Sequence, residues 1–362
     1  MNARKHYIDN IRWITVLLVV FYHVIYIYNG ITLGGAGPFA DRQHQDAVQY
    51  VLYPWFIIIL FIVAGVSARA ALETHTATEF VKSRTQKLLV PSTAGLFVFQ
   101  WIQGYISMSM GNAFDSIPPE MPPLVLYLIM VLSGTGVLWF VQMLWIFSLL
   151  LILVRKLDKN DSFYALCGKA NVIVLMLLGA VAFGAAQILN TPPIIPVYRF
   201  GIYGFAFFAG YFVFSHDCAV EKLSAFFIPF AAGAILLGAV YVRLYFGENY
   251  AEPPVVNNPL AISYAWFMCL AIFGGFYRYL NRTNGFFLFM RKNSFSVYIF
   301  HYMPISAAAL FLRRHEVSAV PSYFLVALAA LIGTFVLSFI IPHIPVLRWC
   351  VLGISRRKTV SS

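Results

Sequence analysis

The sequence has few charged residues. Only 11% of its 362 residues are Asp, Glu, Lys or Arg, whereas 60% are hydrophobic, and the mean hydropathy is +0.77. This composition lies far outside the range of soluble domains. An unpaired backbone amide is too costly in lipid, so spanning segments are helices or closed barrels, and apolar runs of about 20 residues select helices. The expected fold is therefore all-α, a polytopic integral membrane protein.

Among the charged residues, acidic ones are the scarcer kind. The chain holds 14 Asp and Glu residues, and all of them fall in loops or at the ends of the predicted spans. Ion-coupled carriers commonly need carboxylates within the membrane. This weighs against a proton-coupled secondary transporter, an alternative in which His23 and His301 would relay protons.

Cysteines are also few. Of the four, Cys167, Cys218 and Cys350 fall in predicted cytoplasmic segments and Cys269 lies within a predicted span. No pair has the spacing of metal ligands, and the cytoplasm is reducing. We expect neither a disulfide nor a metal site.

Apolar runs dominate what remains, and we predict about ten transmembrane helices. They are Ile11–Tyr28, Val51–Ala68, Leu88–Ile106, Val137–Val154, Ala170–Leu189, Val197–Phe214, Ala225–Tyr245, Leu260–Tyr279, Ser294–Leu312 and Tyr323–Ile344. The apolar sequence from Leu124 to Val154 is too long for one perpendicular crossing, and Ser133-Gly134-Thr135-Gly136 interrupts it. We interpret Leu124–Leu132 as re-entrant or interfacial; one tilted helix is the alternative.

Basic residues gather on one side of these spans. The segments on the N-terminal side hold most of the 25 Lys and Arg residues, and the opposite side holds only Arg42, Arg199, Arg243, Arg313 and Arg314. This asymmetry predicts that both termini are cytoplasmic. It also accounts for the net charge of +11 without nucleic acid as a partner. We predict a membrane domain over residues 1–347 and a short basic cytoplasmic tail over residues 348–362.

The first apolar run carries two polar residues with a defined spacing. Arg12 and His23 are eleven residues apart, which is three helical turns plus about 20°, so they share one helix face at an axial separation of roughly 16 Å. A cation at the membrane entrance and a deep imidazole would suit an elongated ligand with an anionic head and a reactive tail. Asp9, three residues before Arg12, can hold its guanidinium in place.

Two later segments repeat the combination of basic entrance and polar stripe. Arg84 and Lys87 precede Pro91 at the entrance of the third predicted span, where they could clamp phosphates. Ser294, Tyr298 and His301 lie near one face of the ninth predicted span.

Each of these residues also has a structural explanation. Arg12 and Asp9 could be interfacial anchors, and His23 and His301 could be packed histidines. The positive-inside rule alone would place basic residues at positions 84 and 87. A non-catalytic membrane scaffold is a third class of protein, but it would have no use for buried histidines beside basic clusters.

Together the motifs resemble acyltransferase family 3, membrane proteins that O-acylate bacterial envelope glycans. Its opening motif, a basic residue, ten residues and a histidine, matches Arg12 and His23, and Asp9 matches a preceding acidic residue. Two more pieces lie in the first hundred residues: ILFIVAGVSARAAL, in which Ala64-Gly65 replaces the family's Ser-Gly, and the basic residues Arg84 and Lys87 before Pro91. Trp139-Phe140 matches a Trp-Phe motif, with Leu138 in place of the histidine that often precedes it. Ser294, Tyr298 and His301 match the last motif, from which the family's glycine is missing.

The resemblance implies an enzyme of the bacterial cytoplasmic (inner) membrane. It would pass an acyl group from cytoplasmic acyl-CoA to a hydroxyl of an extracytoplasmic carbohydrate or envelope glycoconjugate; acetyl is the expected group, and succinyl or a longer acyl group is the alternative. His23 would be the general base or a transient acyl carrier, a role that burial favours by disfavouring the charged ring. The candidate catalytic residues are His23, Asp9, His301 and Tyr298; the candidate donor-binding residues are Arg12, Arg84, Lys87 and Ser294. Asp41 and Asp46 are candidates for orienting the His23 ring.

Overall fold

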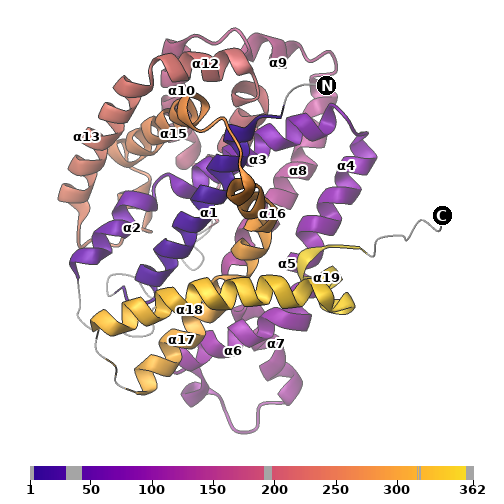
Figure 1. The fold of residues 1–362 in the computed structure, drawn as a ribbon, viewed down its shortest axis with the longest axis vertical. Helices are drawn as coiled ribbons and strands as arrows, with labels where there is room; N and C mark the ends of the chain where they lie inside the picture. Colours follow the sequence, from indigo (N-terminus) through magenta and orange to yellow (C-terminus); the bar gives the residue numbers. More distant parts are fainter. Residues whose placement is uncertain (1–3, 30–42, 191–197, 316, 318, 356–362) are drawn as a thin grey trace. The chain divides into compact units, whose positions relative to one another are not determined.

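The computed structural model describes residues 4–29, 43–190, 198–315, 317 and 319–355 (Figure 1). Within these ranges the chain forms helices and no β-strand; two isolated bridges join Asn190 to Arg199 and Phe246 to Glu248. The all-α prediction is confirmed for the described residues.

Among the described residues, six helical stretches are long and apolar enough to cross a membrane. They are His6–Tyr26, His44–Leu72, Gly136–Leu157, Phe227–Tyr245, Pro259–Tyr279 and Pro321–His343. A bent pair, Gly285–Phe300 with Tyr302–Arg314, makes a seventh if it counts as one span, and three apolar helices are shorter: Pro123–Ser133, Val172–Ala186 and Phe200–Phe214. The protein is therefore a multi-pass membrane protein. The count of ten spans and the side of the termini stay predictions.

The chain divides into two compact units. Unit 1 comprises residues 1–22, 42–77 and 146–294, and unit 2 comprises residues 23–41, 78–145 and 295–362. Helices α1 (His6–Tyr26), α8 (Trp139–Leu157) and α16 (Gly285–Phe300) each continue from one unit into the other.

Unit 1 holds the first part of α1 and most of the central helices. These are η1 (His44–Asp46), α2 (Ala47–Leu52), α3 (Phe56–Leu72), α9 (Ser162–Cys167), α10 (Val172–Ala186), α11 (Phe200–Ala209), η6 (Gly210–Phe214), α12 (Asp217–Ala225), α13 (Phe227–Tyr245), α14 (Pro253–Val256) and α15 (Pro259–Tyr279). Figure 1 shows α13 and α15 side by side, and the two helices pack extensively.

Two glycines bring α3 and the α11–η6 segment of unit 1 into backbone contact. A Cβ atom on Gly65 would lie 2.0 Å from the carbonyl oxygen of Phe207, and one on Gly210 would lie 2.1 Å from that of Ile62. Neither position has room for any other residue. Gly65, the second residue of the Ala64-Gly65 pair noted in the sequence, is thus required for helix packing.

Unit 2 holds the remaining helices. These are α4 (Ala77–Arg84), η2 (Thr85–Leu89), α5 (Val90–Ser92), η3 (Leu96–Gln100), α6 (Trp101–Met110), η4 (Ala113–Ser116), α7 (Pro123–Ser133), η5 (Gly136–Leu138), α17 (Tyr302–Arg314), α18 (Ala319–Ile340), η7 (Ile341–His343) and α19 (Pro345–Leu352). Within this unit α6 packs on α7, and α17 packs on α18 (Figure 1).

Three predicted boundaries differ from the structure. The predicted third span, Leu88–Ile106, is broken into short helical pieces because Pro91 has no N–H to continue the ladder. The predicted ninth span, Ser294–Leu312, bends by 48° at His301, since Pro304 cannot donate to the carbonyl of Phe300. The tail predicted from residue 348 begins inside α19, whose Cys350, Val351 and Leu352 are buried.

The interruption before α8 is confirmed. Helix α7 ends at Ser133 and α8 begins at Trp139, so the apolar sequence over residues 124–154 is not one tilted helix. Whether α7 re-enters the membrane from one side stays a prediction.

Candidate functional site

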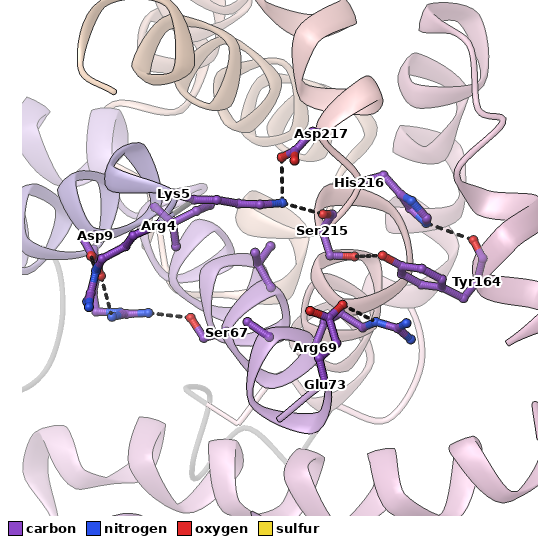
Figure 2. A pocket seen from close by; sticks show the side chains of 14 residues that line it. Arg4, Lys5, Asp9, Ser67, Arg69, Glu73, Tyr164, Ser215, His216 and Asp217 are labelled. Atoms are coloured by element: carbon purple, nitrogen blue, oxygen red, sulfur yellow. Dashed lines mark hydrogen bonds and ion pairs between the residues drawn. The ribbon is translucent and has the colours of Figure 1, made fainter. Parts of the chain in front are cut away.

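Unit 1 contains a charged pocket of about 580 Å³ (Figure 2). The N-terminal part of α1, the C-terminal part of α3, α9 and the junction before α12 form its walls. Its charged lining residues are Arg4, Lys5, Arg12 and Arg69, with Asp9, Glu73 and Asp217 as counterions.

Asp9 is the hub of this basic pocket. Its carboxylate lies 2.8 Å from Arg4 Nε, 3.5 Å from Arg12 Nη1 and 3.7 Å from Arg291 Nη1. The side chain of Asp9 is 12% exposed. One carboxylate cannot neutralise three guanidinium groups, so the hub carries a net positive charge and can attract an anion. The predicted pairing of Asp9 with Arg12 is confirmed.

Arg12 has a second anchor on α3. Its Nη2 donates to Ser67 Oγ at 2.6 Å, and Ser67 Oγ donates to the carbonyl of Val63 at 2.8 Å. The Arg12 side chain is still 36% exposed. Arg12 is thus held in one orientation while part of its surface remains available to a ligand.

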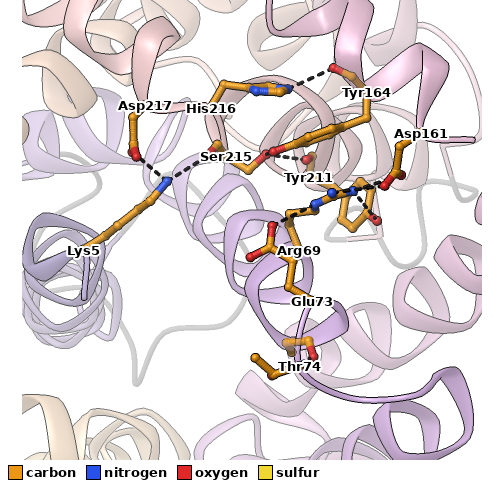
Figure 3. Close-up of polar contacts among 11 residues, drawn as sticks. Lys5, Arg69, Glu73, Thr74, Asp161, Tyr164, Tyr211, Ser215, His216 and Asp217 are labelled. Carbon is orange, nitrogen blue, oxygen red and sulfur yellow. Dashed lines mark hydrogen bonds and ion pairs between the residues drawn. The ribbon is translucent and has the colours of Figure 1, made fainter. Parts of the chain in front are cut away.

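Arg69 is a pocket residue that sequence reasoning missed (Figure 3). Its guanidinium makes a two-pronged ion pair with Asp161, at 3.0 and 3.2 Å, and lies 3.7 Å from the ring centroid of Tyr164. Glu73 binds its Nε at 3.2 Å. Such planar, paired binding suits arginine and not lysine. Arg69 follows the end of a predicted span, where the positive-inside rule alone explains a basic residue, so its sequence context gives no sign of a binding role.

Lys5 and His216 also line the basic pocket. Lys5 Nζ donates to the carbonyl of Ser215 and pairs with Asp217, both at 2.7 Å. The His216 ring stacks on Tyr164 at 3.9 Å between centroids, and its Nε2 lies 2.9 Å from the Tyr164 carbonyl. Burial lowers the pKa of His216 from 6.5, and the positive charges of Arg69 and Lys5 lower it further. The hydrogen bond to the Tyr164 carbonyl acts in the opposite direction and raises this pKa. His216 is therefore neutral at physiological pH.

A pair of histidines meets in unit 2. His301 Nε2 lies 3.2 Å from His23 Nδ1, and His301 Nδ1 lies 2.8 Å from the carbonyl oxygen of Tyr298. His301 is fully buried, and His23 is half-buried with the ring of Tyr302 at 5.0 Å. Tyr302, like the contact between the histidines, could not be inferred from local spacing.

Tyr298 takes part through its backbone. Its hydroxyl donates to the carbonyl of Val137 at 2.6 Å, whereas its own carbonyl faces His301.

Helix α1 runs unbroken from His6 to Tyr26, so Arg12 and His23 do belong to one helix as the sequence predicts.

The remaining candidates lie elsewhere. Arg84 and Lys87 belong to unit 2 and are not among the residues that line the basic pocket; Arg84 packs over the ring of Phe80. Ser294 is buried, and its hydroxyl donates to the backbone carbonyl of Arg291. The donor-binding role of Arg84, Lys87 and Ser294 stays a prediction.

The two aspartates of the first outer loop differ. Asp41 lies outside the described residues. Asp46 is buried in unit 1, and its Oδ2 accepts a hydrogen bond from the backbone N–H of Gln43. Its orienting role towards His23 is not tested. Among the described residues, no group of three or more His, Cys, Asp or Glu could hold a metal ion.

Comparison with known proteins gives one match. The family model described as an acyltransferase domain matches residues 5–342, which is nearly the whole chain and includes the histidine pair and every lining residue of the basic pocket except Arg4. No curated protein and no solved structure matches the chain.

Proposed function

The chain belongs to acyltransferase family 3 and is a membrane acyltransferase, and from this premise we propose that it O-acylates a carbohydrate with acyl-CoA as the donor. The observation that carries the proposal is the hydrogen-bonded pair of His23 and His301. General base catalysis needs an imidazole held in a fixed orientation, and the contact with His301 supports this role for His23.

The basic pocket supports the choice of donor. Coenzyme A carries several phosphate charges at one end and its reactive thioester at the other. Arg4, Arg12 and Arg291 around Asp9, with Lys5 across the pocket, offer guanidinium and ammonium donors to such phosphates. The spacing of Arg12 and His23 on α1, about 16 Å, suits a pantetheine arm that reaches from the phosphates to the thioester.

The proposed reaction is a direct acyl transfer. His23 removes the proton of an acceptor hydroxyl as the oxygen attacks the thioester carbonyl, and a tetrahedral intermediate forms. When that intermediate collapses, the carbon–sulfur bond breaks and the imidazolium returns the proton to the departing thiolate, so the products are an ester and free coenzyme A. If the acceptor cannot reach the thioester, His23 is instead acylated first and then deacylated by the hydroxyl.

The acceptor is proposed from the family. We place it outside the cytoplasmic membrane, as a hydroxyl of a polysaccharide or glycolipid, with the donor on the inner side. The acyl group proposed is acetyl.

Mass spectrometry of the envelope glycans tests both substrates. Cells that express the protein should show glycans heavier by one acyl unit than cells that lack it, and membranes given acetyl-CoA with a labelled acetyl group should transfer the label to glycan. Label that stays on the donor in membranes with ample folded protein would contradict the proposal. A proton-coupled transporter would instead move a solute without any mass change.

A further inference from the structure

The geometry points to His301 as a positioning residue that fixes the proton of His23 on Nδ1 and thereby leaves the basic lone pair on Nε2. This inference rests on the proposed role of His23 in acyl transfer. It concerns which ring nitrogen reacts, which neither the family match nor the basic pocket determines.

The argument begins at the carbonyl of Tyr298. A carbonyl oxygen can only accept a hydrogen bond, so His301 Nδ1, at 2.8 Å, must carry a hydrogen. A neutral imidazole has one N–H, and His301 Nε2 therefore has a lone pair. That lone pair faces His23 Nδ1 at 3.2 Å. His23 Nδ1 must then be the donor, and His23 Nε2 holds the lone pair of the second ring.

The opposite assignment requires a charged His301. If both of its nitrogens carried hydrogens, Nε2 would donate to His23, and the proton of His23 would sit on Nε2. His301 is fully buried, and among the described residues no carboxylate forms an ion pair with it. A buried imidazolium without a counterion is costly, so the neutral chain is favoured.

The local fold holds this chain of groups in place. The hydroxyl of Tyr298 is bonded to Val137, which fixes the residue whose carbonyl begins the relay. His301 stands at the 48° bend between α16 and α17. The ring of Tyr302 packs 5.0 Å from that of His23, which further restricts the imidazole.

The relay also serves the charged state of His23. When Nε2 takes a proton from the acceptor, the Nδ1–H of the imidazolium still points at the lone pair of His301. The positive charge is then stabilised by His301 Nε2 and, through the second ring, by the Tyr298 carbonyl. His301 thus acts in the manner of the carboxylate that orients a catalytic histidine elsewhere, without a buried negative charge.

Two variants of similar length test the role of the acceptor atom. His301→Gln keeps an oxygen that can accept from His23 Nδ1, whereas His301→Met fills similar space and offers no comparable acceptor. We expect kcat to fall about 100-fold in the Met variant and less than about 10-fold in the Gln variant, with KM for acetyl-CoA unchanged in both. Equal losses in the two variants, or wild-type kcat in the Met variant, would overturn the inference.

A spectroscopic measurement covers the case in which a variant does not fold. In protein labelled with ¹⁵N-histidine and reconstituted in nanodiscs, the signals of His23 are those lost in His23→Ala. At neutral pH Nδ1 should show the shift of a protonated nitrogen and Nε2 that of an unprotonated one; the reverse pattern would refute the relay. Since this readout needs no turnover, it separates failure of the relay from failure of the proposed reaction.

Discussion

The basic pocket and the histidine pair use polar groups in opposite ways. In the pocket, each lining cation is bonded to a carboxylate, and the exposed fractions of the paired side chains range from 12% for Asp9 to 59% for Asp217. In the pair, two rings meet through a hydrogen bond, and His301 has no exposed surface. The pocket holds charge with charge, whereas the pair fixes a proton by the direction of hydrogen bonds.

Because of this difference, substitutions in the pocket should reduce activity partly, whereas loss of the base should nearly abolish it. Solvent screens the charges of a partly open pocket, so the loss of one cation leaves others to bind an anion. A base has no such substitute, because only one nitrogen can face the reacting hydroxyl. Substitutions in the pocket should act on substrate affinity, and substitutions in the pair should act on the chemical step.

The largest effect is expected from removal of the base. His23→Ala should lower acetyl transfer about 1,000-fold, because it removes the imidazole that faces the acceptor hydroxyl in the proposed reaction. Transfer of labelled acetyl groups by reconstituted protein measures the effect. His75→Ala, a change at an exposed histidine of the α3–α4 connection, is the matched control and should retain full activity. Activity of His23→Ala within a few-fold of wild type would remove the basis of the comparison.

A pocket cation should give a smaller loss, confined to binding. Arg12→Ala should raise KM for acetyl-CoA about 10-fold and leave kcat nearly unchanged, since one charge-assisted contact is lost. The deficit should shrink as salt rises, because salt already weakens the wild-type contact. Lys82→Ala removes an exposed cation of α4 that does not line the pocket and serves as control. A fall in kcat at constant KM would show that Arg12 acts on the reacting atoms.

Asp9 decides between two roles. As the hub of three arginines it should position the donor site, so Asp9→Asn should raise KM for acetyl-CoA about 5-fold and change kcat little. A catalytic carboxylate would give the reverse, a kcat lowered about 100-fold or more. Steady-state kinetics at several donor concentrations distinguish the two outcomes.

The smallest effect is a pH dependence of stability at the pocket wall. The pKa of His216 is lowered from 6.5, so below that pH the unfolded chain binds a proton more readily than the folded one. Its contribution is fully present above pH 6.5 and is lost as the pH falls towards the lower folded value. Thermal unfolding between pH 7.5 and 5 should therefore show a smaller drop in midpoint for His216→Gln than for wild type. Equal slopes would show that His216 does not titrate in this range.

Local pattern predicted the parts of the site that one helix determines. Helical periodicity gave α1 as the common support of Arg12 and His23, and the three-residue spacing gave the ion pair of Arg12 with Asp9. The break before α8 followed from glycines. These features depend on neighbours within a few turns, which a sequence shows directly.

Long-range contacts could not be obtained in this way. His23 and His301 are 278 positions apart, and their contact depends on how helices of unit 2 pack. Arg69 was hidden for another reason: basic residues at span ends are explained by topology, so no surplus signal marked it. The two helix breaks, in contrast, have a visible signal in the sequence: Pro304 for the bend at His301 and Pro91 for the broken third span.

The backbone contact of Gly65 with Phe207 reaches further than helix packing. Two and four residues after Gly65, α3 presents Ser67 and Arg69, and the segment that faces it continues through η6 to Ser215 and His216. A single methyl group added at Gly65 would clash with the facing backbone and push these two segments apart. The separation of these two walls of the basic pocket thus depends on a residue without a side chain, at a point where no charge is present.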